Sequence, residues 1–124
     1  MFKLKTIKGR LRSFVFAWKG LSHLCLKEDS FKFQVLFSVL FVMAGFYFKI
    51  TPSEWFAQLG MMALVLSLEG INSAIEELAN YNQPEHDLAI GKIKDISAGA
   101  VLVAGIFAFI IGIIIYIPYI LALI

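Results

Sequence analysis

The sequence is poor in charged residues, in proline and in cysteine. Asp, Glu, Lys and Arg together make up 16% of its 124 residues, whereas 60% are hydrophobic, and there are three prolines. This balance is typical of membrane proteins and argues against a soluble domain of this size. Cys25 is the only cysteine, which excludes an intrachain disulfide and is compatible with a reducing compartment.

Familiar nucleotide and metal motifs are missing as well. Gly91-Lys92 lacks the upstream glycine and the following Ser or Thr of a phosphate-binding loop, and no glycine-rich strand-to-helix turn occurs. His23 and His86 have no Cys or His partners at the spacing of metal ligands, which argues against a zinc site. Any nucleotide chemistry must therefore use a different architecture.

What the sequence does contain is three long apolar runs. Polar residues around Pro52 and Pro84 separate them, and residues 96–124 carry no Asp, Glu, Lys or Arg. A helix of about 20 residues crosses the roughly 30 Å of hydrocarbon in a bilayer. We therefore predict an all-α integral membrane protein with a single domain over residues 1–124. Its expected parts are an interfacial helix over 1–28 and spans over 30–49, 54–80 and 90–122, the second with a cytoplasmic extension.

The N-terminal segment has the pattern of an amphipathic helix. Apolar residues recur at alternating steps of three and four while most basic residues lie off that stripe, which consists of Leu4, Ile7, Leu11, Phe14, Trp18, Leu21 and Cys25. Such a helix lies in the membrane interface with its cations toward the lipid phosphates. A short coiled-coil seam would show the same spacing and remains the alternative.

Basic residues are distributed unevenly along the chain. Eight of the eleven Lys and Arg residues precede residue 33, and none follows Lys94. Because cytoplasmic segments of membrane proteins are enriched in Lys and Arg, we expect a cytoplasmic N-terminus and an external C-terminus. The same asymmetry favours a membrane surface over nucleic acid as the partner.

The candidate chemistry lies at the inner end of the second span. Glu69, Asn72, Ser73 and Glu76 fall within one sector of the helix, at about 100° per residue. A carboxylate facing lipid costs at least about 2.5 kcal/mol at mid-bilayer, so this face should point into a bundle or a hydrated cleft. Glu76 lies two turns, or about 10 Å, nearer the cytoplasm than Glu69. One carboxylate could thus meet a lipid hydroxyl while the other meets a metal-bound nucleotide from water.

Further polar residues are expected at the cytoplasmic level. Glu28 is the natural second acid for a Mg²⁺ ion shared with Glu76, because Mg²⁺ needs few carboxylates and takes its other ligands from water and phosphate. Lys94 could balance phosphate charge and Asp95 could orient a donor. A polar cluster at the same level comprises Glu85, His86 and Asp87.

These residues resemble the signature of a known family. Glu69-x-x-Asn72-Ser73-Ala74-Ile75-Glu76, then Pro84-Glu85-His86 and Lys94-Asp95-x-x-Ala98-Gly99-Ala100-Val101, is similar to the prokaryotic diacylglycerol and undecaprenol kinases. The similarity continues upstream through Ala17-Trp18-Lys19-Gly20-Leu21, Glu28 and Phe31.

The resemblance implies a homotrimer with active sites shared between subunits, using ATP and Mg²⁺ to phosphorylate a membrane lipid. On that pattern Glu69 is the catalytic base, and Glu69, Asn72 and Ser73 bind the lipid. Glu28 and Glu76 match the acids that hold the metal. The residues implied in ATP binding are Glu28, Glu76, Glu85, His86, Asp87, Lys94 and Asp95.

The chain departs from the family pattern at three positions. It has Asn80 where Asp is usual, Phe16 where Tyr is usual, and Asp87 near a usual His. The family's upstream arginine could correspond to Arg10 or to Arg12. The acceptor, diacylglycerol or undecaprenol, stays open. Two other functions stay open as well: a small proton-coupled transporter and an inactive kinase homologue.

Overall fold

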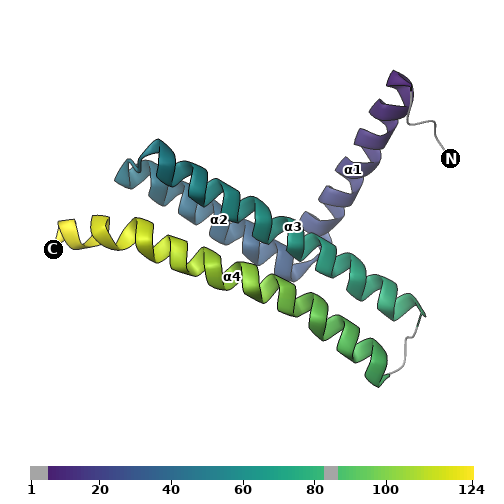
Figure 1. Ribbon diagram of the computed structural model, residues 1–124. Coiled ribbons are helices and arrows are strands. Elements are labelled where there is room, and N and C mark those ends of the chain that lie inside the picture. The colour runs from purple at the N-terminus through teal and green to yellow at the C-terminus, as the bar shows by residue number, and fades with distance from the viewer. Residues whose placement is uncertain (1–5, 83–86) are drawn as a thin grey trace.

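The computed structural model describes residues 6–82 and 87–124, which form four helices and no strand. These are α1 (Ile7–Lys27), α2 (Asp29–Phe48), α3 (Pro52–Asn82) and α4 (Leu88–Leu123). In Figure 1, α3 runs alongside both α2 and α4, while α1 leaves this bundle at a steep angle. The predicted all-α fold is confirmed.

Three of the helices can cross a membrane by length and composition. They cover Asp29–Phe48, Pro52–Tyr81 and Leu88–Leu123. At 1.5 Å per residue α2 is about 30 Å long, and α3 and α4 are longer by about 15 Å or more. Figure 1 shows that the α2–α3 turn and the end of α4 lie at one end of the bundle, whereas α3 and α4 continue past the start of α2 at the other. We call the end with these projections the inner end of the bundle, and the end with the α2–α3 turn the outer end.

The α2–α3 turn is specified by local hydrogen bonds. Lys49 adopts a left-handed conformation (φ 53°), and the next N–H, of Ile50, donates to the Gly45 carbonyl at 3.1 Å. A capping box then starts α3: the Glu54 N–H donates to Thr51 Oγ1 at 3.2 Å, and the Thr51 N–H donates to Glu54 Oε1 at 2.9 Å. The break in the apolar pattern around Pro52 is therefore a tight helical hairpin.

The best-packed part of the bundle lies next to this turn. Ile50, Ile115 and Tyr116 are buried there and pack against neighbours that include Trp55. Gly45 lets the Trp55 ring approach closely, since a Cβ at residue 45 would lie 2.6 Å from Trp55 Cη2. The outer ends of α2, α3 and α4 are thus held together by apolar packing.

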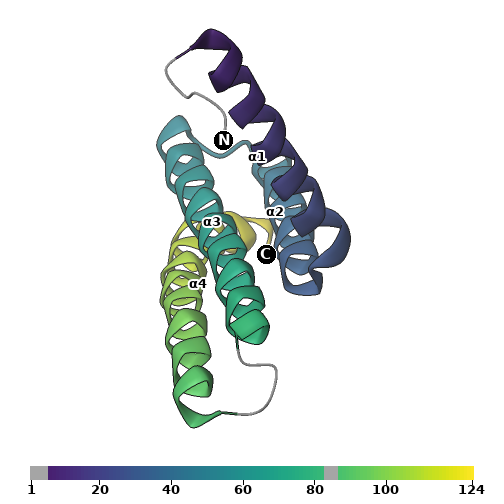
Figure 2. The ribbon, with the colours of Figure 1, turned by 90° about the vertical axis from the view of Figure 1, so that its right-hand side faces the viewer.

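Helix α1 keeps its apolar side uncovered by the rest of the chain. Phe14 and Trp18 are 69% and 62% exposed. Such exposure suits a helix whose apolar side enters lipid. Its C-terminal end meets the bundle, where Leu24 packs over α3: a Cβ on Gly70 would lie 3.1 Å from Leu24 Cδ1. Figure 2 shows α1 rising away from the bundle of α2, α3 and α4.

Candidate active site

The polar side chains of this sector of α3 are buried in the middle of the helix and exposed toward the inner end of the bundle. Glu69, Asn72 and Ser73 are 7%, 8% and 7% exposed. Glu76 and Asn80 continue the same sector, but both are exposed. The chain therefore presents a ridge of polar groups, defined by these five residues, that runs from a buried stretch to an exposed surface.

The buried stretch of the ridge is short of internal partners. Within residues 6–82 and 87–124, the Asn72 Oδ1 atom is buried without a hydrogen bond. Leaving such an acceptor unpaired typically costs about 1–3 kcal/mol. The Glu69 carboxylate likewise makes no hydrogen bond or ion pair to that part of the chain. The buried stretch of the ridge therefore holds two acceptor groups without a hydrogen-bond partner in the described part of the chain.

The α1–α2 junction lies beside the ridge. Phe31, 5% exposed, and Leu24 both approach α3 at Gly70, next to Glu69. Their packing places Glu28, the residue between α1 and α2, near the same level of the bundle. The junction thus brings Glu28, which is partly exposed, to α3 from a distant part of the sequence.

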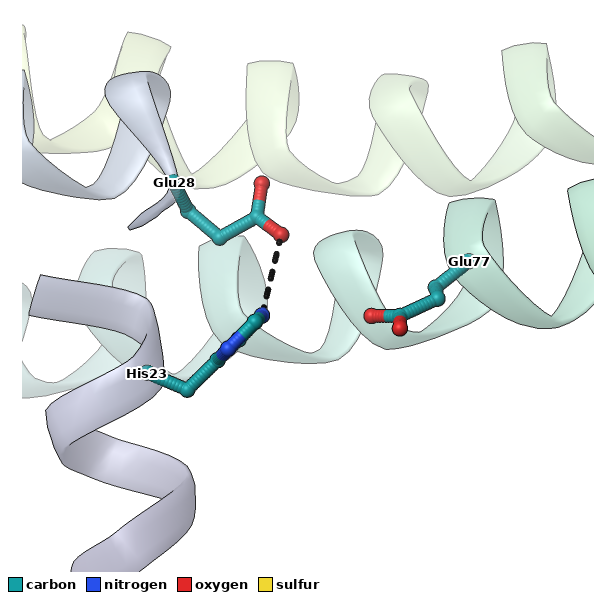
Figure 3. A group of neighbouring side chains, drawn as sticks. All are labelled: His23, Glu28 and Glu77. Carbon is teal, nitrogen blue, oxygen red and sulfur yellow. Dashed lines mark ion pairs between the residues drawn. The ribbon is translucent and has the colours of Figure 1, made fainter. Parts of the chain in front are cut away.

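Three side chains near the junction could hold a metal ion. Ligand atoms of His23, Glu28 and Glu77 all lie within 4.8 Å of one another. Figure 3 shows Glu77 pointing from α3 toward the other two, and His23 Nε2 lies 3.7 Å from Glu28 Oε1. Two carboxylates on an open surface fit Mg²⁺, which keeps water or phosphate at its remaining positions.

The structure pairs Glu28 with Glu77, whereas the sequence pattern pairs it with Glu76. Successive residues on a helix point about 100° apart, so only one of these two neighbours can face the junction in a given packing. His23 and Glu77 were missed by sequence reasoning because they lie 54 positions apart and form no spaced motif. Only the contact between α1 and α3 brings them together.

The remaining sequence-predicted residues belong to the inner end of α4. The Asp87 carboxylate caps that helix, accepting from the N–H groups of Ala89 (2.8 Å) and Ile90 (3.1 Å). Lys94 donates from its Nζ to Asn80 Oδ1 on α3. Asp95 is exposed.

The other predicted site residues either fall outside the described residues or lie far from the α1–α2 junction. Glu85 and His86 fall outside the described residues. Arg10 and Arg12 are both exposed in the first half of α1, whereas the junction with α2 lies at its other end.

Comparison with known proteins identifies the family of the chain. Residues 15–116 match the family model for prokaryotic diacylglycerol kinase. The undecaprenol kinase of Bacillus subtilis (strain 168) is 30% identical over 107 residues, covering 86% of this chain and 87% of that protein. A diacylglycerol kinase of Synechocystis is 33% identical over 116 residues, covering 91% of this chain and 65% of that protein. The Escherichia coli K12 diacylglycerol kinase is 28% identical over 93 residues, which are 75% of this chain and 76% of that protein.

The family match spans most of the chain, including α2, α3 and the ridge. Together with three helices that can span a bilayer, it establishes a multi-pass membrane protein of a kinase type. The chain belongs to the prokaryotic diacylglycerol kinase family, whose members are lipid kinases.

Proposed function

We propose that this chain transfers the terminal phosphate of ATP to the hydroxyl of a membrane lipid, with Glu69 as the base and Mg²⁺ as the cofactor. One observation carries the proposal: the ridge on α3 is buried at Glu69 and Asn72 and exposed at Glu76. A lipid hydroxyl and a water-soluble nucleotide need such a graded site to meet.

On the lipid side, the Glu69 carboxylate removes the proton of the acceptor hydroxyl as its oxygen bonds to the γ-phosphorus of ATP. The bond between that phosphorus and the bridging oxygen of ADP breaks, so the products are a phosphorylated lipid and ADP. We assign Asn72, whose Oδ1 has no hydrogen-bond partner in the described part of the chain, to the lipid headgroup, and Ser73 adds a hydroxyl beside it.

On the nucleotide side, carboxylates at the junction and on α3 would hold Mg²⁺, which when bound neutralises charge on the phosphate oxygens. Glu28 is one holder. The sequence signature supports Glu76 as the second, and the cluster of Figure 3 supports Glu77. The other residues that we assign to ATP are Glu85, His86, Asp87, Lys94 and Asp95.

We further propose a homotrimer with shared active sites in a bacterial cytoplasmic membrane, with the N-terminus on the cytoplasmic side. Two features support sharing. No described side chain is fully buried within one chain, and the large apolar residues of α2 and α4 are mostly exposed. Glu76 is also exposed, so a neighbouring subunit could enclose a nucleotide bound there. The basic N-terminal segment supports the orientation.

Phosphoryl transfer is tested with purified protein in mixed lipid micelles, labelled ATP and Mg²⁺, with diacylglycerol and undecaprenol as separate acceptors. We expect transfer to at least one of them, and the more active acceptor identifies the substrate. Glu69→Gln should lower kcat by about 10²- to 10⁴-fold, the usual contribution of a positioned base. Asp29→Asn is the matched control, because the Asp29 side chain is 88% exposed and pairs only with Lys32 among the described residues.

Transfer by the Glu69→Gln protein at the wild-type rate would contradict the role of Glu69. Folded wild-type protein that phosphorylates neither lipid would instead favour an inactive homologue. Glu76→Gln and Glu77→Gln, each titrated with Mg²⁺, decide which acid shares the metal with Glu28. The variant that needs more Mg²⁺ for half-maximal activity identifies it.

A further inference from the structure

A side-chain contact joins the inner ends of α3 and α4. Lys94 on α4 donates from its Nζ to Asn80 Oδ1 on α3. In the described part of the chain, the other side-chain hydrogen bonds between these helices are those of Gln58 with Tyr116 and of Glu54 with Tyr119, which lie at the outer end. The Lys94–Asn80 hydrogen bond thus lies at the inner end, where the proposed phosphoryl transfer takes place.

Asn80 stands in line with the ridge. It follows Glu69 by eleven residues, which is about three helical turns, so the two side chains leave α3 within about 20° of each other and about 16 Å apart along the axis. Glu76 lies one turn before Asn80 on the same line. A lysine held by Asn80 therefore has its ammonium beyond the acids, on the side from which a nucleotide approaches.

The chemistry of the contact preserves the charge of Lys94. An ammonium has three N–H donors, of which the Asn80 oxygen takes one and leaves two for phosphate oxygens. The acceptor is neutral, so the positive charge is not cancelled. A free lysine side chain loses up to about 2 kcal/mol of rotamer entropy when a ligand immobilises it. A hydrogen bond that restricts the chain beforehand reduces that cost at the moment of binding.

We propose that Asn80 is a positioning residue, which holds the Lys94 ammonium in place for the phosphate groups of a nucleotide bound at the inner end of the ridge. This inference rests on the proposed function, because it takes ATP as the ligand. Asn80 acts through Lys94 and contacts neither the lipid hydroxyl nor the reacting phosphorus.

The test compares three variants in the transfer assay and in equilibrium binding of a non-hydrolysable ATP analogue with Mg²⁺. Asn80→Leu keeps the size of the side chain and removes the acceptor. We expect KM for ATP and Kd for the analogue to rise about 2- to 10-fold, the net value of one hydrogen bond, while KM for the lipid stays the same. Asn80→Asp retains an acceptor oxygen but adds a negative charge beside Lys94, so we expect a smaller loss of ATP affinity than in Asn80→Leu. Lys94→Met should weaken ATP binding by itself.

The double variant Asn80→Leu/Lys94→Met is decisive. If Asn80 acts through Lys94, it binds the analogue no more weakly than Lys94→Met alone. Lys92 supplies the matched control, because it is an exposed lysine on α4 without a hydrogen bond or ion pair in the described part of the chain. In the Lys92→Gln background, Asn80→Leu should have its full effect.

If Asn80→Leu lowers the affinity for the analogue in the Lys94→Met background by the same factor as in the wild type, the inference is overturned. An Asn80→Leu protein with unchanged ATP affinity would also overturn it. If Asn80→Leu instead causes a general structural defect, KM for the lipid should rise as well and Asn80→Asp should be no better than Asn80→Leu. That result would also overturn the inference. If the wild-type protein transfers no phosphate, the proposed function fails. An active wild type with independent effects at residues 80 and 94 refutes the positioning role alone.

Discussion

The hydrogen bonds buried near the outer end of the bundle give a sharp prediction about stability. The Tyr116 hydroxyl donates to Gln58 Oε1 at 2.5 Å, and Gln58 Nε2 donates to the Phe41 carbonyl at 3.1 Å. Gln58 and Tyr116 are only 6% and 7% exposed. One amide side chain therefore links α2, α3 and α4 where water is largely excluded.

The two single substitutions should differ in cost. Tyr116→Phe removes the donor and leaves Gln58 Oε1 buried without a partner, which costs about 1–3 kcal/mol in proteins, with bonds between membrane helices toward the lower end. Gln58→Leu is milder, because the Tyr116 hydroxyl already lies 3.0 Å from the Phe41 carbonyl and can donate there instead. We expect a loss of about 1.5 kcal/mol for Tyr116→Phe and less than about 1 kcal/mol for Gln58→Leu.

The double variant should be more stable than Tyr116→Phe alone, because it leaves no orphaned side-chain polar group. Equilibrium unfolding in mixed micelles with increasing SDS, followed by tryptophan fluorescence and circular dichroism, measures all three free energies. A double variant at least as unstable as the sum of the single variants would refute the reasoning, and so would a Gln58→Leu protein less stable than Tyr116→Phe.

Three further predictions concern the α2–α3 hairpin and use the same unfolding assay. Gly45→Ala should destabilise the protein by about 1–3 kcal/mol, because the new Cβ would lie 2.6 Å from the Trp55 ring; unchanged stability would mean that the ring moves freely. Lys49→Gly should stabilise it by up to about 1 kcal/mol, since glycine adopts the observed φ of 53° without the steric cost of a side chain. Thr51→Ala should cost about 0.5–2 kcal/mol through loss of the cap to the Glu54 N–H, and Thr51→Ser should restore most of it.

Several properties follow from the sequence because they depend on local patterns alone. Three apolar runs of spanning length predict three helices regardless of how these pack, and the structure has them. The one-sided spacing of Glu69, Asn72 and Ser73 is fixed by helical periodicity once α3 forms. That this side turns inward was also predictable, since polar groups avoid lipid, and these three side chains are buried.

The candidate metal-binding cluster of His23, Glu28 and Glu77 could be found only from the tertiary structure. Whether Glu76 or Glu77 faces Glu28 depends on the rotation of α3 against the α1–α2 junction, which the packing of Leu24 and Phe31 on Gly70 decides. The sequence cannot reveal a rotation of one residue step, about 100°, because α3 carries an acid at both residue 76 and residue 77.

The contacts across helices likewise lay beyond the sequence. Nothing local pairs Lys94 with Asn80, or Tyr116 with Gln58, because each pair joins helices whose relative shift along their axes is set by packing. The sequence by itself determined which residues are polar, on which helix they lie and on which side of it. Only the tertiary structure decided which of them meet, because meeting depends on helix rotation and offset, which are properties of the packed bundle.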